Sequence, residues 1–226
     1  MDAALKEFVS RLGYVFENVD LLNRALRHAS LDIDDNNERL EFLGDRVLGL
    51  VIAGLILEKY PSEKEGDLAR RLADLVSRRV CAEIAHEIGL SGAMRCDPGQ
   101  KDKGAPARNI LANGCEAVLG AVYLDGGIQA AERVISRLWH IRLEAQTSAP
   151  IDAKTSLQEW VMKRKLNMPV YQIIAQSGPA HAPTFRVSVS VGDTIVEGAG
   201  PSRRLAEQSA AAKCLDVLLQ KPEGNA

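Results

Sequence analysis

The sequence predicts an all-helical domain followed by a small domain of order α-β-β-β-α. Up to residue 90, apolar residues recur at spacings of three and four, which is typical of amphipathic helices. Residues 185–191 instead alternate between apolar and polar side chains, which is typical of a strand buried on one face. Between these patterns lies a small, polar, proline-containing stretch. We therefore expect domains at 1–145 and 153–222, joined by a linker at 146–152.

The composition fits ordinary globular domains with aliphatic cores, because 46% of the 226 residues are hydrophobic and only 4% are aromatic. The four cysteines are scattered and form no Cys-x-x-Cys pair, so we expect buried, reduced thiols and neither a disulfide framework nor a zinc ribbon. The N-terminus has no uninterrupted apolar segment, and nowhere do about 18 apolar residues run together. These features predict a cytoplasmic protein with no membrane partner.

The charge is distributed unevenly along the chain, although its formal net value is only −2. Residues 1–150 hold 19 Lys and Arg against 23 Asp and Glu, whereas residues 151–226 hold 9 against 7. The second part is therefore mildly basic and the first part acidic. This asymmetry permits a polyanion-binding module joined to an acidic, metal-dependent one.

The early part of the chain divides into successive amphipathic helices. Pro61 cannot continue the third of them, and the acids Glu65 and Asp67 suit the dipole at the start of the fourth. His28 follows an amphipathic segment and is interpreted as a structural residue. The helices are expected at residues 3–12, 18–28, 37–59, 65–76 and 78–89.

A polar stretch and two further helices complete the first domain. Residues 91–108 contain prolines, glycines and basic side chains, which indicates a loop that either contacts phosphate or is merely flexible. Residues 109–124 are nearly all apolar, and their small side chains would let a neighbouring helix approach closely. A turn at 125–127 leads into a helix at 128–144.

Three acids in the third predicted helix occur at helical spacing. At about 100° per residue, Glu38, Glu41 and Asp45 fall within roughly 60° of one another, whereas the aliphatic residues share a different arc. Like charges at this spacing destabilise a helix, so the acids need open solvent or a cation. Phe42 projects beside them, which suggests a partner surface. Gly44 costs about 1 kcal/mol against Ala in a helix, and close approach of another helix would explain it.

Glu116 lies within the nearly apolar helix, where a carboxylate is costly to bury unless it is paired or binds a metal. Asn113 precedes it by three residues and therefore shares its face. Glu116 is thus the acid least easily explained as a solvated side chain, and we expect it to have a functional role.

The second domain begins and ends with a helix. The first is expected at 154–165 and the last at 202–219, with Ser202 as its N-cap. Gly192 and Asp193 form the turn between the last two strands. The strands are expected at 170–176, 185–191 and 194–198.

These motifs resemble those of bacterial ribonuclease III. Residues 37–45 read Asn-Glu-Arg-Leu-Glu-Phe-Leu-Gly-Asp, which is close to a fingerprint of that family, and residues 65–67 and 109–127 also match it. The α-β-β-β-α tail resembles a double-stranded-RNA-binding domain. Together the two likenesses cover almost the whole chain in the family's order. The second likeness is carried by residues 154–159, 178–181 and 200–208.

The resemblance implies a homodimeric, magnesium-dependent endonuclease that cuts double-stranded RNA, with Mn²⁺ as an alternative ion. It implies 5′-phosphate and 3′-hydroxyl ends, short 3′ overhangs and a role in processing ribosomal and messenger RNA. Divalent ions held by carboxylates suit this hydrolysis, since they polarise the phosphoryl oxygen and activate water. Phe42 would lie in the dimer contact. The resemblance places the metal ligands at Glu41, Asp45, Asn113 and Glu116, and the catalytic acids at Asp45, Glu116, Glu38 and Glu65.

Asn113 departs from the family pattern, which has Asp at the corresponding position. An amide oxygen can still bind a metal, but the replacement removes a full negative charge. We therefore expect weaker metal binding and not its loss. One alternative is a protein that binds double-stranded RNA with weak or absent cleavage. Another is a helical phosphohydrolase that acts on a small molecule and carries an accessory tail.

For the tail, the resemblance implies recognition of RNA by shape, because the minor groove of an A-form duplex presents 2′-hydroxyls. Arg203 and Arg204 would meet phosphates at a helix N-terminus, where backbone N–H groups also favour an anion. His181 would reach a second minor groove, and salt should weaken the binding. The first minor groove would be contacted by Thr155, Gln158 and Glu159.

Overall fold

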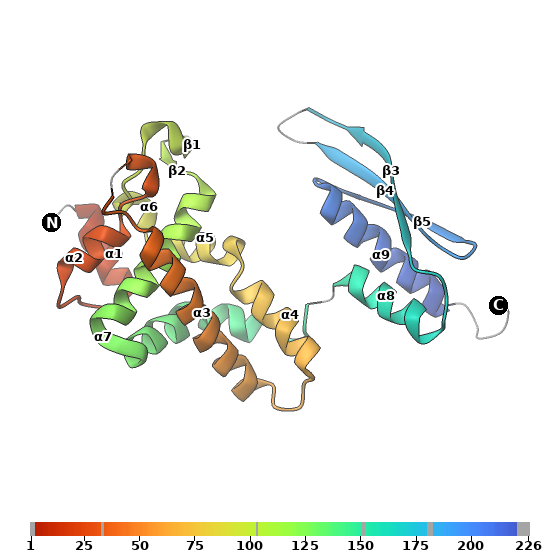
Figure 1. Cartoon of the computed structure of the whole chain (residues 1–226), viewed down its shortest axis with the longest axis horizontal. Coiled ribbons are helices and arrows are strands. Elements are labelled where there is room, and N and C mark those ends of the chain that lie inside the picture. The colour runs from red at the N-terminus through yellow and green to blue at the C-terminus, as the bar shows by residue number, and fades with distance from the viewer. Residues whose placement is uncertain (1–2, 33, 103, 151, 180–182, 221–226) are drawn as a thin grey trace. The chain divides into compact units, whose positions relative to one another are not determined.

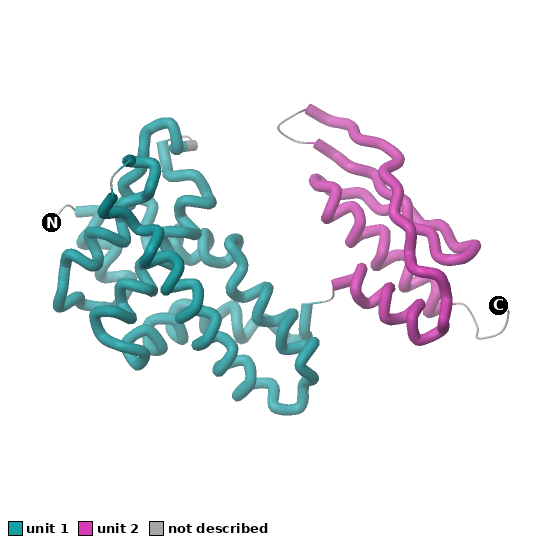
Figure 2. Tube along the Cα trace, in the orientation of Figure 1, with its two compact units in different colours: residues 1–150 teal, residues 151–226 magenta. Residues whose placement is uncertain are grey.

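The computed structural model of the chain divides into two compact units, residues 1–150 and 151–226 (Figure 2). The structure describes residues 3–32, 34–102, 104–150, 152–179 and 183–220. Over those residues, unit 1 is helical apart from one short hairpin, and unit 2 combines a three-stranded sheet with two helices (Figure 1). The predicted fold class, an all-helical domain followed by an α-β-β-β-α domain, is confirmed.

The helices of unit 1 bury their apolar faces in one common core. Trp139 is fully buried in it, and its indole N–H donates to the backbone oxygen of Leu75 at 2.9 Å. The helices are α1 (Ala3–Leu12), α2 (Val19–Ala25), α3 (Glu38–Lys59), α4 (Glu65–Leu75), α5 (Arg78–Glu87), α6 (Leu90–Ala93) and α7 (Arg108–Ala145), with 3₁₀ turns η1 (Ala29–Leu31) and η2 (Pro98–Gln100).

Helices α3 and α7 cross at two glycines. A Cβ atom on Gly44 would lie 1.7 Å from the backbone oxygen of Glu116, and one on Gly120 would lie 2.3 Å from that of Leu40. Both neighbours are backbone atoms, so a larger residue could not be accommodated by rotating a side chain. The prediction that another helix passes close to Gly44 is confirmed. The crossing sets Glu116 of α7 beside the acids of α3.

Helix α7 is broken at Gly127, whose backbone has φ 72° and ψ −172°. This break agrees with the turn predicted at 125–127, since a positive φ favours glycine. The loop predicted at 91–108 is only partly correct, because its described part contains most of α6, the turn η2 and a pair of strands. Strands of two residues are too short to produce an alternating pattern, which explains the error. They are β1 (Lys101–Asp102) and β2 (Ala105–Pro106).

A buried arginine ties the C-terminal end of α7 to α3 and α4. Arg71 is 1% exposed, donates to the two carboxylate oxygens of Glu63 at 2.7 and 2.5 Å, and lies 3.6 Å from the centroid of the Tyr60 ring. It also donates to the backbone oxygen of Gln146 at 2.9 Å. A buried guanidinium needs such partners. The predicted linker at 146–152 therefore starts at a residue bonded to unit 1, and its role as a linker stays a prediction.

Unit 2 packs two helices against an antiparallel sheet of order β3-β4-β5. Three alternate valines of the central strand are buried, which confirms the predicted alternation. Ser202 accepts from the Leu205 N–H at 3.3 Å and is the N-cap that the sequence predicts, while Asp152 caps the first helix by accepting from the Thr155 N–H at 2.9 Å. The elements are α8 (Ala153–Lys163), β3 (Val170–Ser177), β4 (Thr184–Val191), β5 (Thr194–Gly200) and α9 (Arg203–Gln220).

The sequence predicts buried, reduced thiols and no membrane-spanning segment. Cys81, Cys96, Cys115 and Cys214 are free and buried, as predicted. Within the described ranges, each helix is too short or too polar to cross a lipid bilayer.

Candidate functional site

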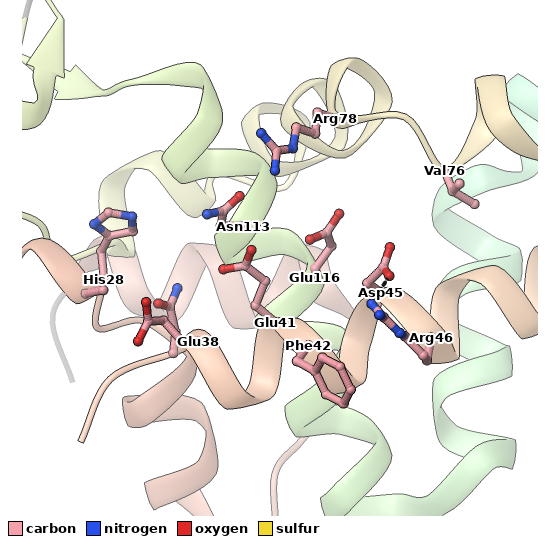
Figure 3. Close-up of a pocket in the computed structure, with 12 residues that line it drawn as sticks. His28, Glu38, Glu41, Phe42, Asp45, Arg46, Val76, Arg78, Asn113 and Glu116 are labelled. Carbon is pink, nitrogen blue, oxygen red and sulfur yellow. Dashed lines mark hydrogen bonds and ion pairs between the residues drawn. The ribbon is translucent and has the colours of Figure 1, made fainter. Parts of the chain in front are cut away.

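A cleft of about 480 Å³ opens in unit 1 between α3, α5 and α7 (Figure 3). Carboxylates from α3 and α7 line it together, although their helices are far apart in the sequence. The cleft therefore collects most of the residues predicted for the catalytic and metal site. Those that line it are Glu38, Glu41, Asp45, Asn113 and Glu116, and Phe42, which was predicted for the dimer contact, lines it as well.

Helix α3 supplies three carboxylates to the cleft. Glu38, Glu41 and Asp45 follow one another at about one turn, and all three line the cleft, so the predicted common face is confirmed. Asp45 forms an ion pair with Arg46, whose guanidinium lies 4.5 Å from the centroid of the exposed Phe42 ring. Asp45 is thus engaged by a neighbour on its own helix.

Glu116 is the acid of the cleft held deepest, with 8% of its surface exposed. Burial, followed by the charges of Asp45 and Glu41, raises the pKa of Glu116 from the usual 4.5 to about 7. Burial is also the main reason that the pKa of Glu41 is raised, and Arg78 opposes this shift. The cleft therefore concentrates negative charge that a cation would relieve.

The donor atoms of the cleft suit a hard divalent cation. Glu41, Asp45 and Glu116 offer carboxylate oxygens, and Asn113 offers an amide oxygen, the type of ligand that Mg²⁺ prefers. As the side chains stand, the part of the chain that the structure describes contains no group of three His, Cys, Asp or Glu placed to hold one ion together. Mg²⁺ keeps several waters and needs only one or two direct carboxylates. The residues fit the ion in chemistry, and release of Asp45 from Arg46 would free a further oxygen.

His28 lies at the end of the cleft next to Glu38 (Figure 3). Its Nδ1 accepts from the Ser30 backbone N–H at 3.1 Å, which leaves the proton of the neutral ring on Nε2. Burial lowers the pKa of His28, and Glu38 opposes that shift. The bond to Ser30 agrees with the structural role predicted for His28, but the ring also lines the cleft, which the sequence did not indicate.

Three further polar residues that line the cleft were not predicted as site residues from the sequence, namely Asn37, Arg46 and Arg78. Asn37 is fully buried at the start of α3, and its side-chain amide bonds to none of the described residues. Its position before the helix suggests an ordinary N-cap, yet it makes no side-chain capping bond. No local pattern marks Arg78, because only the folding of α5 against α7 brings it to the acids.

The remaining predicted residues lie away from this cleft. Glu65 begins α4 and is not among the residues that line the cleft within a single described chain. In unit 2, Thr155 and Glu159 are exposed on α8, and Gln158 is half-buried there. The prediction for His181 concerns a position outside the described residues.

Arg203 and Arg204 are both exposed at the start of α9. Arg203 donates to Glu207 at 2.8 Å, and Glu207 also accepts from Lys154 at 2.7 Å. Arg203 therefore has a partner within its own helix, which the sequence did not lead us to expect. Its side chain is still 64% exposed, so the guanidinium remains accessible to an anion.

The raised pKa of Glu116 predicts that the stability of the metal-free protein depends on pH. The folded state holds the Glu116 proton more tightly than the unfolded state does, so the free energy of unfolding falls as the pH rises from 4.5 to about 7. Glu116→Gln removes this titration. Urea unfolding in EDTA should show the variant gaining about 1–2 kcal/mol over the native chain between pH 5 and pH 8, after allowance for solvent screening. A difference that stays constant with pH would contradict the expectation.

Two family models match the chain. A model described as "Ribonuclease-III-like" matches residues 18–141, and a model described as "Double-stranded RNA binding motif" matches residues 153–218. The first match contains the acidic cleft, and the second spans the helices and strands of unit 2. The fold and the cleft thus define an endoribonuclease joined to a double-stranded-RNA-binding module.

Individual relatives extend this match to nearly the full length. Ribonuclease 3 of Jannaschia sp. (strain CCS1) is 45% identical over 218 residues, which cover 95% of this chain and 96% of that protein. The crystal structure of the nuclease domain of ribonuclease III from Campylobacter jejuni is 34% identical, with a TM-score of 0.59, and covers 63% of this chain and 97% of that one. The chain belongs to the ribonuclease III family, whose members are endoribonucleases acting on double-stranded RNA.

A second structure of the Campylobacter jejuni nuclease domain is 33% identical to this chain, with a TM-score of 0.57. It covers 65% of this chain and 99% of that one, and it concerns structural flexibility in a region involved in dimer formation.

Proposed function

We propose that this chain is a divalent-metal-dependent endoribonuclease that hydrolyses double-stranded RNA to 5′-phosphate and 3′-hydroxyl ends with short 3′ overhangs. We propose that it acts in the processing of ribosomal and messenger RNA. The observation that carries the proposal is the meeting of Glu116 with the α3 acids in one cleft. A solvated acidic face would not require the glycine crossing that brings a buried carboxylate to them.

We assign a role to each residue of the cleft from how deeply it is buried and from the atom that it offers to a metal ion. A bound Mg²⁺, or Mn²⁺ in its place, would supply the positive charge that polarises the phosphoryl oxygen and activates water. The chain itself fixes Glu116 against α3 and presents Glu38 next to His28 at one end. We assign the ion to Glu41, Asp45, Asn113 and Glu116, with Asp45, Glu116 and Glu38 as the catalytic acids of the cleft. Glu65 lies outside the cleft, and we propose it as a catalytic acid on the family resemblance alone.

Unit 2 would supply most of the affinity for the duplex. Thr155, Gln158 and Glu159 share one helix and are suited to a minor groove, while Arg204 is an exposed cation at the start of α9. Arg203 would also contact the RNA once a phosphate displaces Glu207 as its hydrogen-bond partner. Because such binding releases counterions, it should weaken steeply with salt.

Incubating a long RNA duplex with the protein, with and without Mg²⁺, tests the proposal on a gel. Progressive shortening of the RNA only when the ion is present is the expected result. A duplex that is shifted but keeps its length would instead identify a binding protein. Deleting residues 150–226 should greatly reduce affinity for the duplex at physiological salt, whereas a small-molecule phosphohydrolase would be largely unaffected.

Asn113 predicts an unusual demand for the metal ion. Its amide oxygen carries no net charge, so the ion meets one negative charge fewer than a carboxylate would supply. Asn113→Asp should lower the Mg²⁺ concentration needed for half-maximal cleavage by about 10-fold, within the range seen for changes around metal ligands. The measurement is the cleavage rate as a function of Mg²⁺ for both proteins, and an unchanged requirement would contradict this role.

We further propose that the chain works as a homodimer, joined through the exposed face of α3. Phe42 is 64% exposed, Leu50 66% and Leu57 62%, and Leu124 of α7 is exposed next to this face. Large apolar side chains exposed together favour a partner surface. The region of dimer formation named for the Campylobacter jejuni domain is consistent with this proposal.

Replacing Phe42 by a charged residue should therefore weaken the dimer. Loss of an aromatic anchor from such a contact costs about 2 kcal/mol or more, so Phe42→Glu should shift the protein toward monomer at micromolar concentration. Light scattering after gel filtration measures the mass. Ile141→Glu also places a Glu at an exposed large apolar side chain, which is 77% exposed near the C-terminal end of α7 and is not one of the residues named for this face, and it should leave the mass unchanged. If both variants have the same mass as the native chain, Phe42 does not hold the dimer together.

A further inference from the structure

The wall of the acidic cleft opposite α3 carries one arginine, Arg78, which is the first residue of α5. Figure 3 shows its guanidinium turned toward Asn113 and Glu116, on the other side of the acids from Phe42. Ser77 caps α5 by accepting from the Val80 N–H, so the backbone that carries Arg78 is fixed at this wall. Arg78 thus holds a positive charge over the predicted metal site.

The two arginines that line the cleft differ in their interaction partners. Arg46 is paired with Asp45 and stacked on Phe42. Arg78 makes no hydrogen bond or ion pair with any of the described residues, although it is close enough to lower the pKa values of Glu41 and Glu116 against the larger effect of their burial. Its guanidinium is therefore available to an incoming anion.

Asn113 contributes to the availability of Arg78. The side chain at position 113 points into the cleft below the guanidinium (Figure 3), and an amide offers no negative charge to capture it. A carboxylate at this position would add a negative charge facing Arg78, which is exposed, and would attract its guanidinium. The neutral residue that we expect to weaken metal binding thus also adds no charge that would hold the arginine.

We propose that Arg78 binds a phosphate of the RNA strand that enters the cleft, and that Asn113 keeps it free to do so. This inference rests on the proposed function. A planar guanidinium donates two parallel hydrogen bonds to phosphate oxygens, which suits it to position a phosphodiester. A strand approaching four carboxylates is otherwise repelled, and a cation on the facing wall offsets part of that repulsion.

The test compares duplex binding by the full-length protein in EDTA over a range of salt concentrations. Arg78→Gln should weaken binding by about 5- to 10-fold near 0.1 M salt and lower the slope of log K against log salt by about 0.9, the effect of losing one phosphate contact. Arg78→Lys keeps the charge and should restore most of the slope. Arg133→Gln removes an exposed arginine of α7 outside the cleft and should change neither quantity.

A double-mutant cycle tests the part played by Asn113. Asn113→Asp should itself weaken binding in EDTA, and Arg78→Gln in that background should cost only about 2-fold, because the arginine is already occupied. Any of three outcomes would overturn the proposal. The salt slopes of the native chain and Arg78→Gln could be equal, Arg78→Gln and Arg78→Lys could bind the duplex identically, or the effects of Asn113→Asp and Arg78→Gln on affinity could be additive. The melting temperature of each variant shows whether a smaller salt slope comes from unfolding. If Arg78→Gln is unfolded, the salt slope of Arg78→Lys decides whether the charge at position 78 contacts phosphate.

Failure of this inference is distinguishable from failure of the proposed function. If the native chain cuts the duplex in Mg²⁺ and Arg78→Gln leaves KM and the salt slope unchanged, only the role of Arg78 is lost. If the native chain leaves the duplex uncut, the proposed function fails, and the binding comparison in EDTA still decides whether Arg78 contacts phosphate.

Discussion

Glu116→Gln should lower the rate of duplex cleavage by more than about 100-fold, because changes that only surround metal ligands already cost about 10–100-fold. Glu116 is the deepest acid of the cleft and comes from a different helix than the other carboxylates. No other acid that lines the cleft comes from α7, so none can take over its position. Duplex binding should persist, since the residues expected to contact the grooves lie in unit 2.

The comparison needs a matched control on the same helix. Glu132→Gln removes the same charge from an exposed position of α7 outside the cleft, and should leave cleavage within about 2-fold of the native rate, as for an ordinary surface substitution. Single-turnover cleavage in Mg²⁺ and duplex binding in EDTA are measured for the three proteins. Substantial cleavage by the Gln variant would place the chemistry elsewhere.

Gly44→Ala should destabilise the folded protein by about 3 kcal/mol or more, at the upper end of what overpacking costs. The added methyl group would lie 1.7 Å from the Glu116 backbone oxygen and 2.6 Å from its carbon, and backbone cannot rotate away as a side chain does. Helices α3 and α7 would have to separate. Any protein that still folds should cleave poorly, because the crossing sets Glu116 against Glu41.

Gly54→Ala provides the control for helix propensity. It lies on the same helix, and nothing stands within 4 Å of the position that its Cβ would occupy. This substitution should stabilise the protein by about 0.5–1 kcal/mol, since alanine loses less backbone entropy than glycine in a helix. Urea unfolding of both variants measures the contrast. Similar stabilities for the two would show that the crossing does not depend on glycine.

Much of the fold could be predicted from the sequence because its signals are local. The spacing of apolar residues gives the helices of unit 1, and the alternation in β4 gives the sheet of unit 2. The acids of α3 share a face for the same reason, since helical periodicity alone fixes their directions. Gly44 also pointed to a close neighbour, because its cost in a helix needs a compensating contact.

Some features that the sequence did not reveal depend on contacts between distant segments, and others are local pairings among several that the sequence allows. Arg78 reaches the cleft only because α5 packs against α7. The ion pair of Asp45 with Arg46 joins adjacent residues, and residue order alone does not show which partner a charged side chain takes. Arg203 was expected to face RNA alone, but its bond to Glu207 arises from their spacing of four residues on a partly buried helix face. The strands β1 and β2 are too short to leave any pattern.

The most direct test of the central claim is the analysis of products from one defined RNA duplex incubated with Mg²⁺. Sequencing both strands gives the position of each cut, and end-group analysis identifies the phosphate and hydroxyl termini. We predict cuts on both strands, offset to leave short 3′ overhangs, with 5′-phosphate and 3′-hydroxyl ends. Intact strands in a stable complex, or cuts confined to single-stranded regions, would contradict the assignment of the acidic cleft as a double-stranded-RNA nuclease.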